Sequence, residues 1–198
     1  MKIIIVGATG TIGKHVAKAL EKEHEVIKAG SKSGDLQVDI TSVDSIERFF
    51  EQTGKFDALV SATGVGYFGP FDTMKDSDFR VGIDSKLMGQ INLVLTGKNY
   101  VNPKGSFTLT SGILLDEPII FGANLSAVNG AIEGFVKGAA IELDNNVRIN
   151  AVSPGVVEDS PGFFPYFHGH EPVSMVRVTQ AYVKSVLGAL TGQVFKVF

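Results

Sequence analysis

The sequence predicts an α/β domain in which a mainly parallel sheet lies between two layers of helices. Short apolar, β-branched runs alternate along the chain with longer amphipathic runs, which is the pattern of strands joined by crossover helices. The first run, Lys2–Val6, carries four consecutive apolar residues, as in strands that are buried on both faces. Because crossovers between parallel strands are right-handed, this order predicts a three-layer, doubly wound sheet of the Rossmann type.

Length and composition restrict the class of protein. The 198 residues suit one domain over positions 1–198, and 44% hydrophobic against 20% charged residues is enough for a packed core. The net charge of −3 and the lack of a long basic tract argue against a nucleic-acid partner. There is no cysteine, hence no disulfide or thiolate metal site, and no apolar run of membrane-spanning length. The chain enters its first strand with no targeting segment before it, so we expect a cytoplasmic protein without a membrane partner.

The glycine-rich turn after the first strand is the strongest sign of a ligand. Residues 7–13 read GATGTIG and lead into an amphipathic run. Glycines let the backbone turn tightly and approach a ligand closely, and the N-terminus of the following helix offers free N–H groups to a pyrophosphate. The alternative is a tight turn without a ligand. The candidate cofactor residues here are Gly7, Thr9, Gly10, Thr11, Ile12 and Gly13.

The other expected elements follow from periodicity and turn signals. Further strands are expected over 25–29, 36–40, 58–61, 105–110, 147–152 and 193–197, and helices over about 43–52, 76–95, 123–143 and 174–189. Thr41 or Ser42 can cap the first of these helices. Only GSKSGD separates the second and third strands, whereas parallel strands normally need a dozen or more connecting residues. Either this crossover is truncated or one of the two strands is wrongly assigned.

The end of the second strand bears on the choice of nicotinamide cofactor. Ligands of such sheets bind at the carboxyl ends of the strands, and an NAD site places an acid about 20 residues past the glycines to hold the ribose 2′-hydroxyl. Here Ser31, Lys32 and Ser33 supply hydroxyls and a cation, which suit a 2′-phosphate. We therefore expect NADP(H) as the cofactor. The alternative is a solvated loop lysine without a ligand role.

Two more strand ends carry candidate cofactor residues. Asp39, next to Ile40, could accept a hydrogen bond from an adenine amino group or could cap the next helix. Ala62, Thr63 and Gly64 end the fourth strand with small residues, which either let a flat ligand lie against the backbone or form an ordinary turn. On the residues alone, both alternatives stay open at each of these strand ends.

An ordered set of motifs resembles the short-chain dehydrogenases/reductases over roughly Lys2 to Gly192. The motifs are GATGTIG, VDIT, SATG, TSG, SAVNGAIEGFVKGAAIEL and VRINAVSPG, in the order seen in that family. The resemblance implies a Rossmann-type fold and a nicotinamide cofactor. The roles that it implies are pyrophosphate binding for Gly7, Gly10 and Gly13, adenine contact for Asp39, adenosine-ribose contact for residues 62–64, and nicotinamide contact for Pro154, Gly155 and Val156.

The expected catalytic residues depart from the family's pattern. The family serine is matched by Ser111, but the Tyr-x-x-x-Lys pair is replaced by Leu125 and Asn129, and the family asparagine by Lys86. Carbonyl reduction needs a proton donor beside the developing alkoxide, and a nearby cation tunes the pKa of that donor. Leucine cannot donate a proton, and asparagine carries no charge. Hydride chemistry is therefore expected to be slow or absent unless another group substitutes.

Other groups could stand in for the missing pair. Ser111 could orient a carbonyl, and Lys86 could supply the cation, unless Lys86 is an ordinary surface lysine. Four titratable residues lie on loops that could fold over the cleft: Tyr67, Tyr166, His168 and His170. No third ligand accompanies the two histidines, so no metal site is expected. The aromatic stretch 163–167 is either a lid that favours a flat apolar ligand or a patch packed on the core or on a partner subunit.

Small residues recur at four-residue steps on the helix that follows Ser111. They are Ser126, Gly130, Gly134 and Gly138, and they indicate close backbone packing on one helix face. The resemblance implies a homo-oligomer, a dimer or tetramer, formed through this helix and the long helix that precedes it. Three functions stay open: an NADP(H)-dependent oxidoreductase acting on a small-molecule carbonyl or alcohol through Ser111 and Lys86, an NADP(H)-binding sensor or interaction module without turnover, and a relic that no longer binds the cofactor.

Overall fold

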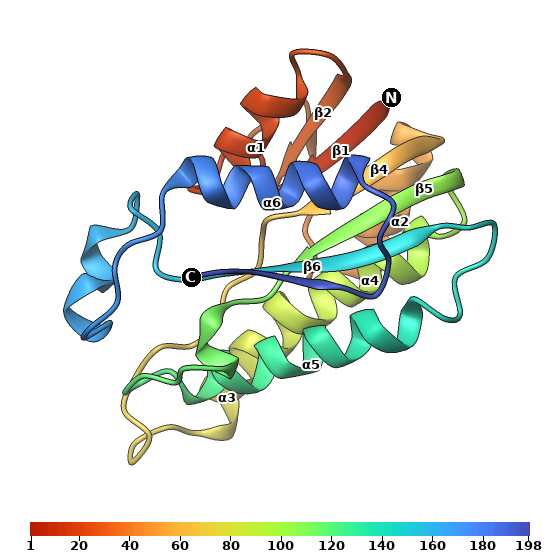
Figure 1. Ribbon diagram of the computed structural model, residues 1–198. Coiled ribbons are helices and arrows are strands. Elements are labelled where there is room, and N and C mark those ends of the chain that lie inside the picture. Colours follow the sequence, from red (N-terminus) through yellow and green to blue (C-terminus); the bar gives the residue numbers. More distant parts are fainter.

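A computed structural model, which describes residues 1–198, contains one seven-stranded parallel sheet (Figure 1). The strands are β1 (Lys2–Val6), β2 (Glu25–Gly30), β3 (Leu36–Gln37), β4 (Phe56–Ser61), β5 (Val101–Thr110), β6 (Arg148–Pro154) and β7 (Val194–Val197). Their order across the sheet is β3-β2-β1-β4-β5-β6-β7, and every neighbouring pair is parallel. This confirms the predicted fold class. The strand order reverses between β1 and β4, so a ligand is expected at the carboxyl ends of these two strands.

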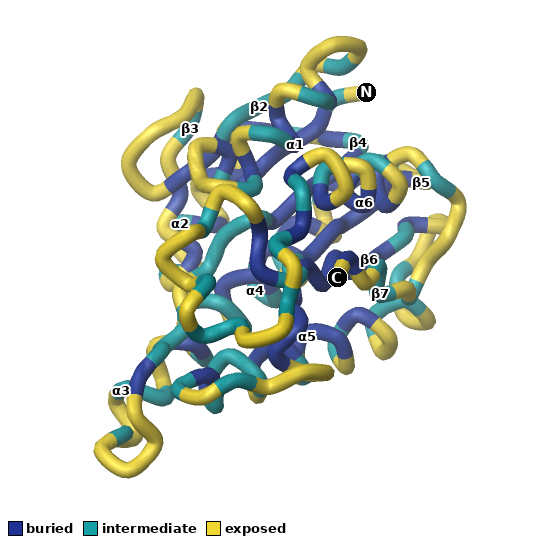
Figure 2. The backbone as a smooth tube through the Cα atoms, turned by 60° about the vertical axis from the view of Figure 1, so that its left-hand side comes forward, coloured by how far each residue is buried: buried dark blue, intermediate teal, exposed yellow.

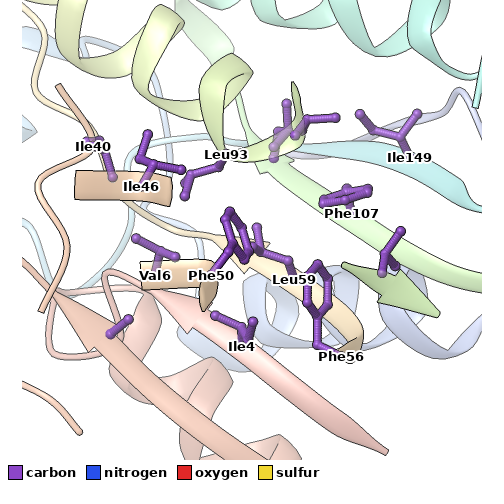
Figure 3. Close-up of a cluster of buried hydrophobic side chains, with 14 of the residues drawn as sticks. Ile4, Val6, Ile40, Ile46, Phe50, Phe56, Leu59, Leu93, Phe107 and Ile149 are labelled. Carbon is purple, nitrogen blue, oxygen red and sulfur yellow. The ribbon is translucent and has the colours of Figure 1, made fainter. Parts of the chain in front are cut away.

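Helices cover both faces of the sheet and create two separate cores. One core involves α1 (Gly13–Leu20) and α6 (Met175–Leu187), and the other involves α2 (Val43–Thr53), α4 (Gly89–Gly97) and α5 (Ala123–Ala139). The two cores explain why consecutive residues of β1 are apolar. Ile3 and Ile5 face the α1/α6 core, whereas Ile4 and Val6 face the α2/α4/α5 core. Figure 3 shows Ile4 and Val6 among the aromatic rings of that second core.

The connection between β2 and β3 is a truncated crossover, which settles the alternative left open by the sequence. Gly30 is in register with Gln37, and no helix lies between the two strands. The backbone N–H of Lys28 donates to Asp35 Oδ2 at 2.8 Å, and the Asp35 N–H donates back to the Lys28 carbonyl at 2.7 Å. Gly34 has a φ of +114°, which favours glycine. The third strand stops at Gln37, shorter than the expected 36–40.

The long helix expected over 76–95 is present but not uniform. It consists of α3 (Asp76–Val81), a π-helical segment η1 (Gly82–Met88) and α4. The Gln90 side chain donates to the carbonyls of Lys86 and Thr110, and its oxygen accepts from the Thr110 N–H. Gln90 therefore ties the π-helical segment to the end of β5. Such segments are frequent at functional sites.

The loops at the carboxyl ends of the strands project beyond the sheet. They include the short helices η2 (Ile113–Leu115) and η3 (Pro161–Tyr166). Figure 1 shows η3, in light blue, standing out at the left beyond the strand ends. Figure 2 shows the central strands β1 and β4 mostly buried and the loop that enters α3 largely exposed. A parallel bridge between Val157 and Val173 closes the base of the segment that carries η3. No helix is long and apolar enough to cross a membrane.

Candidate functional site

The glycine turn lies against the end of β4, at the reversal of strand order. A Cβ on Gly7, whose φ is +85°, would overlap the carbonyl oxygen of Ala62. A Cβ on Gly13 would overlap the carbonyl oxygen of Gly7, so the turn can close only with glycine at both positions. The backbone N–H groups of Thr11, Ile12 and Gly13 donate no hydrogen bond within the chain. Free donors at the N-terminus of α1 are the features that suit a pyrophosphate.

The loop after β2 lies beside the glycine turn, although the two are distant in sequence. The hydroxyls of Thr9 and Ser33 share a hydrogen bond of 2.9 Å. Ser31, Lys32 and Ser33 are all exposed. The nearest acid of this loop, Asp35, accepts from the Lys28 N–H and is therefore turned back toward β2. The loop thus presents hydroxyls and one cation next to the turn.

Asp39 has a local structural role that differs from helix capping. Its Oδ1 accepts from the Thr41 N–H at 2.9 Å and from the Thr41 hydroxyl at 2.7 Å. These hydrogen bonds hold the pKa of the Asp39 carboxyl below its usual value. Ser42, and not Asp39, caps α2 by accepting from the Ser45 N–H. Ile40, the neighbour of Asp39, is buried and contacts Gly89 of α4.

The end of β4 packs directly on the π-helical segment. Gly64 has a φ of +110°, and a Cβ there would lie 2.6 Å from the Cα of Lys86. The Val65 N–H donates to the Ser85 hydroxyl at 3.0 Å. The strand end 62–64 and the base of Lys86 therefore form one wall. The small side chains expected there allow this close approach.

Lys86 and Asn129 form the polar centre of the site. The Lys86 Nζ donates to Asn129 Oδ1 at 2.7 Å and to the Ser111 carbonyl at 3.2 Å. Asn129 Nδ2 in turn donates to the Gly112 carbonyl at 3.1 Å. Burial lowers the pKa of Lys86 to about 8. Compared with the family pattern, the lysine and the asparagine have exchanged helices, and the two side chains still meet.

The Ser111 hydroxyl points toward α5. Its Oγ donates to Glu133 Oε1 at 2.8 Å, with a longer contact of 3.3 Å to the Asn129 carbonyl. Ser111 and Glu133 are both buried. The hydroxyl reaches a substrate only by rotating away from Glu133. Sequence reasoning did not single out Glu133, although it is the one acid within the apolar, glycine-rich run of α5 and lies four residues after Asn129.

An apolar cavity of about 200 Å³ opens between the glycine turn, the end of β6 and the segment that carries η3. Nine of its twelve lining residues are hydrophobic. Ile12, Pro154, Gly155 and Val156, which were predicted to bind the cofactor, line it together. So does Leu125, which stands at the family's tyrosine position and also packs against Gly66. The cavity thus lies at the predicted nicotinamide position.

Aromatic rings from three separate loops gather at the cavity. Phe68 contacts Phe121, Phe163 and Tyr166 edge-on, with centroid distances of 5.9, 5.6 and 5.0 Å. Phe68 and Phe163 line the cavity, as does Phe167. The aromatic stretch 163–167 therefore borders the cavity, and we refer to the segment that carries it, between Val157 and Val173, as the lid. We call Phe68, Phe121, Phe163 and Tyr166 the aromatic cluster.

The remaining titratable loop residues do not form a second polar centre. Tyr67 is held through its backbone N–H, which donates to Asn124 Oδ1 at 2.8 Å. His170 lies 3.5 Å from Glu117. No group of three His, Cys, Asp or Glu side chains gathers that could hold a metal ion.

Polar contacts fasten the base of the lid to α1. Asp159, just before η3, accepts from Lys14 Nζ and lies within hydrogen-bond distance of His15 Nε2, both at 2.9 Å. These two contacts lower the pKa of the Asp159 carboxyl. Glu158 accepts from the Met175 N–H at 2.6 Å, where the chain returns to α6. The start of the lid is therefore anchored to α1 through Asp159 and to the start of α6 through Glu158.

The chain matches one protein family over most of its length. A model of the family described as Enoyl-(Acyl carrier protein) reductase matches residues 6–163. The crystal structure of the protein lin1944 from Listeria innocua has a TM-score of 0.98 and 50% identity, with full coverage of both chains. A small-chain dehydrogenase solved in complex with NADPH has a TM-score of 0.89 and 28% identity, covering 100% of this chain and 96% of that one. An uncharacterised oxidoreductase from Methylorubrum extorquens is 25% identical over 178 residues, 78% of this chain and 72% of that protein.

Proposed function

Because the chain belongs to the short-chain dehydrogenase/reductase family, we propose that it binds NADP(H) as a single domain and acts as an oxidoreductase on carbonyl or alcohol groups. The observation that carries the proposal is the Lys86–Asn129 contact of 2.7 Å. It keeps a cation beside the strand ends, although the family's Tyr-x-x-x-Lys pair is missing. The cavity lined by Pro154, Gly155 and Val156 is the proposed nicotinamide site, and the substrate is proposed to lie between it and Lys86.

The cofactor assignment rests on the geometry of the turn and of the loop after β2. Two glycines that tolerate no Cβ and three free N–H groups fit a pyrophosphate at Gly7–Gly13. Ser31, Lys32 and Ser33 fit a 2′-phosphate, and the related small-chain dehydrogenase was solved with NADPH. The other proposed contacts are Thr9, Thr11 and Ile12 at the turn, Asp39 and Ile40 at the adenine end, Ala62, Thr63 and Gly64 at the ribose, and Pro154, Gly155 and Val156 at the nicotinamide.

In the proposed reaction, each polar residue has a distinct part. Bound in this cleft, NADPH would supply the hydride. Lys86, held by Asn129 and by the Ser111 carbonyl, supplies positive charge near the developing negative charge of the substrate. Ser111 fixes Lys86 through its backbone, and its hydroxyl can orient a substrate only when released from Glu133. The apolar cavity and the aromatic cluster exclude water from the reacting atoms.

A self-association surface on α4 and α5 is a further part of the proposal. A Cβ on Gly134 or Gly138 would meet nothing within 4 Å, so this half of the small-residue stripe faces outward, whereas a Cβ on Gly130 would lie 3.1 Å from the Leu115 side chain of η2. Leu95 of α4, near Gly138 in the same shallow depression, is also exposed. We propose that a second copy covers this face in a dimer or tetramer. The cytoplasmic location stays a prediction.

A second candidate function is an NADP(H)-binding module without turnover. Leu125 favours it, because the cavity wall carries no proton donor at the family's tyrosine position. The test is NADPH oxidation against a panel of ketones and aldehydes for the wild type and Lys86→Met. Turnover that falls at least 100-fold in the variant supports the oxidoreductase. NADPH binding without turnover on any acceptor supports the binding module.

A further inference from the structure

Gln90 is the one buried polar side chain of α4, and it has no part in the proposed reaction. Its amide bonds to two separate backbone segments. Nε2 donates to the carbonyls of Lys86 and Thr110, both at 3.0 Å, and Oε1 accepts from the Thr110 N–H at 2.8 Å. Both donor hydrogens and the acceptor oxygen of the amide are therefore engaged. Gln90 thus joins the backbone of the residue that carries the proposed cation to the end of β5.

The peptide groups of Thr110 need these contacts, because the sheet opens at this point. The Ser111 N–H donates to β6, and successive peptide groups of a strand face opposite neighbours, so those of Thr110 face β4. The register between β4 and β5 ends at Val60 and Thr108, and beyond it β4 continues to pair with β1 only. The amide of Gln90 therefore takes the place of a strand partner beside Thr110.

Gln90 also fixes both ends of a contact that holds the cation. Lys86 Nζ donates to the Ser111 carbonyl at 3.2 Å, and Ser111 follows Thr110 directly. The Lys86 carbonyl, the Gln90 amide, the Thr110 and Ser111 backbone and the Lys86 ammonium therefore form a closed ring. A lysine side chain is a flexible four-carbon stem, so the place of its ammonium depends on where its backbone is held. The ring holds that backbone and the acceptor carbonyl together.

The helix geometry at Lys86 makes such a tie important. Lys86 lies in η1, whose hydrogen bonds span five residues instead of four. The direction in which a side chain leaves this wide turn depends on how the turn is held. Gly64 packs closely on it, since a Cβ there would lie 2.6 Å from the Lys86 Cα. Gln90, in the first turn of α4, is the side chain that ties the end of the wide turn to β5.

We propose that Gln90 is a positioning residue for Lys86, which rests on the proposed oxidoreductase function. It holds the Lys86 backbone against the end of β5, so that the ammonium lies at Asn129 and at the Ser111 carbonyl. Gln90 does not line the cavity at the nicotinamide position. It therefore acts on the reaction only through Lys86.

The charge state of Lys86 gives the first test, without cofactor or substrate. Lysine Cε is labelled with ¹³C, and the Lys86 signal is assigned by its absence from Lys86→Arg. Burial lowers the pKa of Lys86 to about 8 in the wild type. Gln90→Met removes the three amide contacts at similar side-chain volume, so the wide turn loosens and the ammonium reaches water. Its titration midpoint should then rise toward the ordinary lysine value of about 10.4.

Ser185→Ala is the matched control for the loss of a buried hydrogen bond. The Ser185 hydroxyl of α6 shares a hydrogen bond of 2.7 Å with Thr108 of β5, on the face of the sheet opposite to α4. This variant weakens the contacts of the same strand without touching Lys86, so the Lys86 midpoint should not move. An unchanged midpoint in Gln90→Met, or an equal rise in both variants, would overturn the proposal. If Gln90→Met does not fold, Gln90→Asn, whose amide is one methylene too short for the ring, is held to the same criterion.

Turnover gives the second test, with a carbonyl compound that the wild type reduces. At pH 7 the kcat of Gln90→Met should fall at least about tenfold, because a small displacement of a reacting group is costly. NADPH affinity should change little, and Ser185→Ala should keep the wild-type kcat. An unchanged kcat in Gln90→Met contradicts the positioning role. A wild type that reduces no acceptor contradicts the proposed function instead, and the Lys86 titration then decides by itself whether Gln90 positions the cation.

Discussion

The ammonium of Lys86 and the side-chain oxygen of Asn129 lie 2.7 Å apart, so a cation from the π-helical segment meets an amide from α5. In the family pattern the amide stands at position 86 and the cation at position 129. The two departures from that pattern are therefore a single exchange that preserves one charge and one amide at the same place.

Removing the charge of Lys86 should impair turnover more than cofactor binding. Lys86→Met is expected to lower kcat by about 100-fold or more, in the range typical for loss of an acid–base or charged group. The double variant Lys86→Asn with Asn129→Lys, which reverses the exchange, should recover kcat to within about tenfold of the wild type. Steady-state NADPH oxidation measures both, with NADPH affinity as the control. An unchanged kcat in Lys86→Met would remove Lys86 from the reaction.

The depressed pKa of Lys86 makes turnover depend on pH. Burial lowers this pKa to about 8, so the side chain is charged below pH 8 and neutral above it. Turnover that needs the ammonium should fall as the pH rises through about 8. In Lys86→Arg the side chain stays charged at all accessible pH values, so any remaining activity should not fall there. A wild-type profile that stays flat from pH 7 to 9 would contradict this assignment.

Ser111 is expected to matter more for stability than for turnover. Its hydroxyl is buried and donates to Glu133 at 2.8 Å. Ser111→Ala leaves the Glu133 oxygen without this donor and should lower the free energy of unfolding by about 1–3 kcal/mol. Turnover should fall by less than about tenfold, because the carbonyl that holds Lys86 is kept. Urea unfolding and steady-state kinetics separate the two effects. A loss of more than 100-fold at unchanged stability would place the hydroxyl on the substrate.

Gly13 should tolerate no side chain. Gly13→Ala pushes a methyl group into the Gly7 carbonyl, and such overpacking costs about 1–3 kcal/mol of stability. NADPH binding should be lost, because the turn must open to relieve the clash. Gly162→Ala is the matched control, since nothing lies within 4 Å of a Cβ there and the φ of Gly162 is not positive. Thermal unfolding compares the two, and equal stabilities would refute the tight-turn explanation.

The fold could be predicted because its signals are local. Apolar runs such as Lys2–Val6 form buried strands, and their alternation with amphipathic runs dictates a parallel sheet. The predicted ends of strands and helices were wrong where polar side chains redirect the backbone. The third strand stops at Gln37, and the turn that follows is held by Asp39 and Thr41. The helix expected to reach 143 ends at Ala139, before Asn145 and Asn146 adopt positive φ.

The site could be predicted only in part, because it depends on contacts between distant residues. The sequence identified Lys86 and Ser111 separately as candidates. It could not reveal that Lys86 meets Asn129, since the distance depends on how the π-helical segment packs against Gly64. Nor could it reveal that Ser111 donates to Glu133 on the next helix. Only part of the aromatic cluster could be predicted from the sequence. Phe163 and Tyr166 lie in the aromatic stretch 163–167, whereas Phe68 and Phe121 come from loops that carry no recognisable motif.

The most direct test of the central claim is a fluorescence titration of the protein with NADPH and, separately, with NADH. If the glycine turn holds the pyrophosphate and the loop 31–33 holds a 2′-phosphate, NADPH should bind at least tenfold more tightly than NADH. Lys32→Ala should remove most of that preference while leaving NADH affinity unchanged. If neither nucleotide binds at millimolar concentration, the cofactor site does not exist as described, and both the oxidoreductase and the binding-module proposals are wrong.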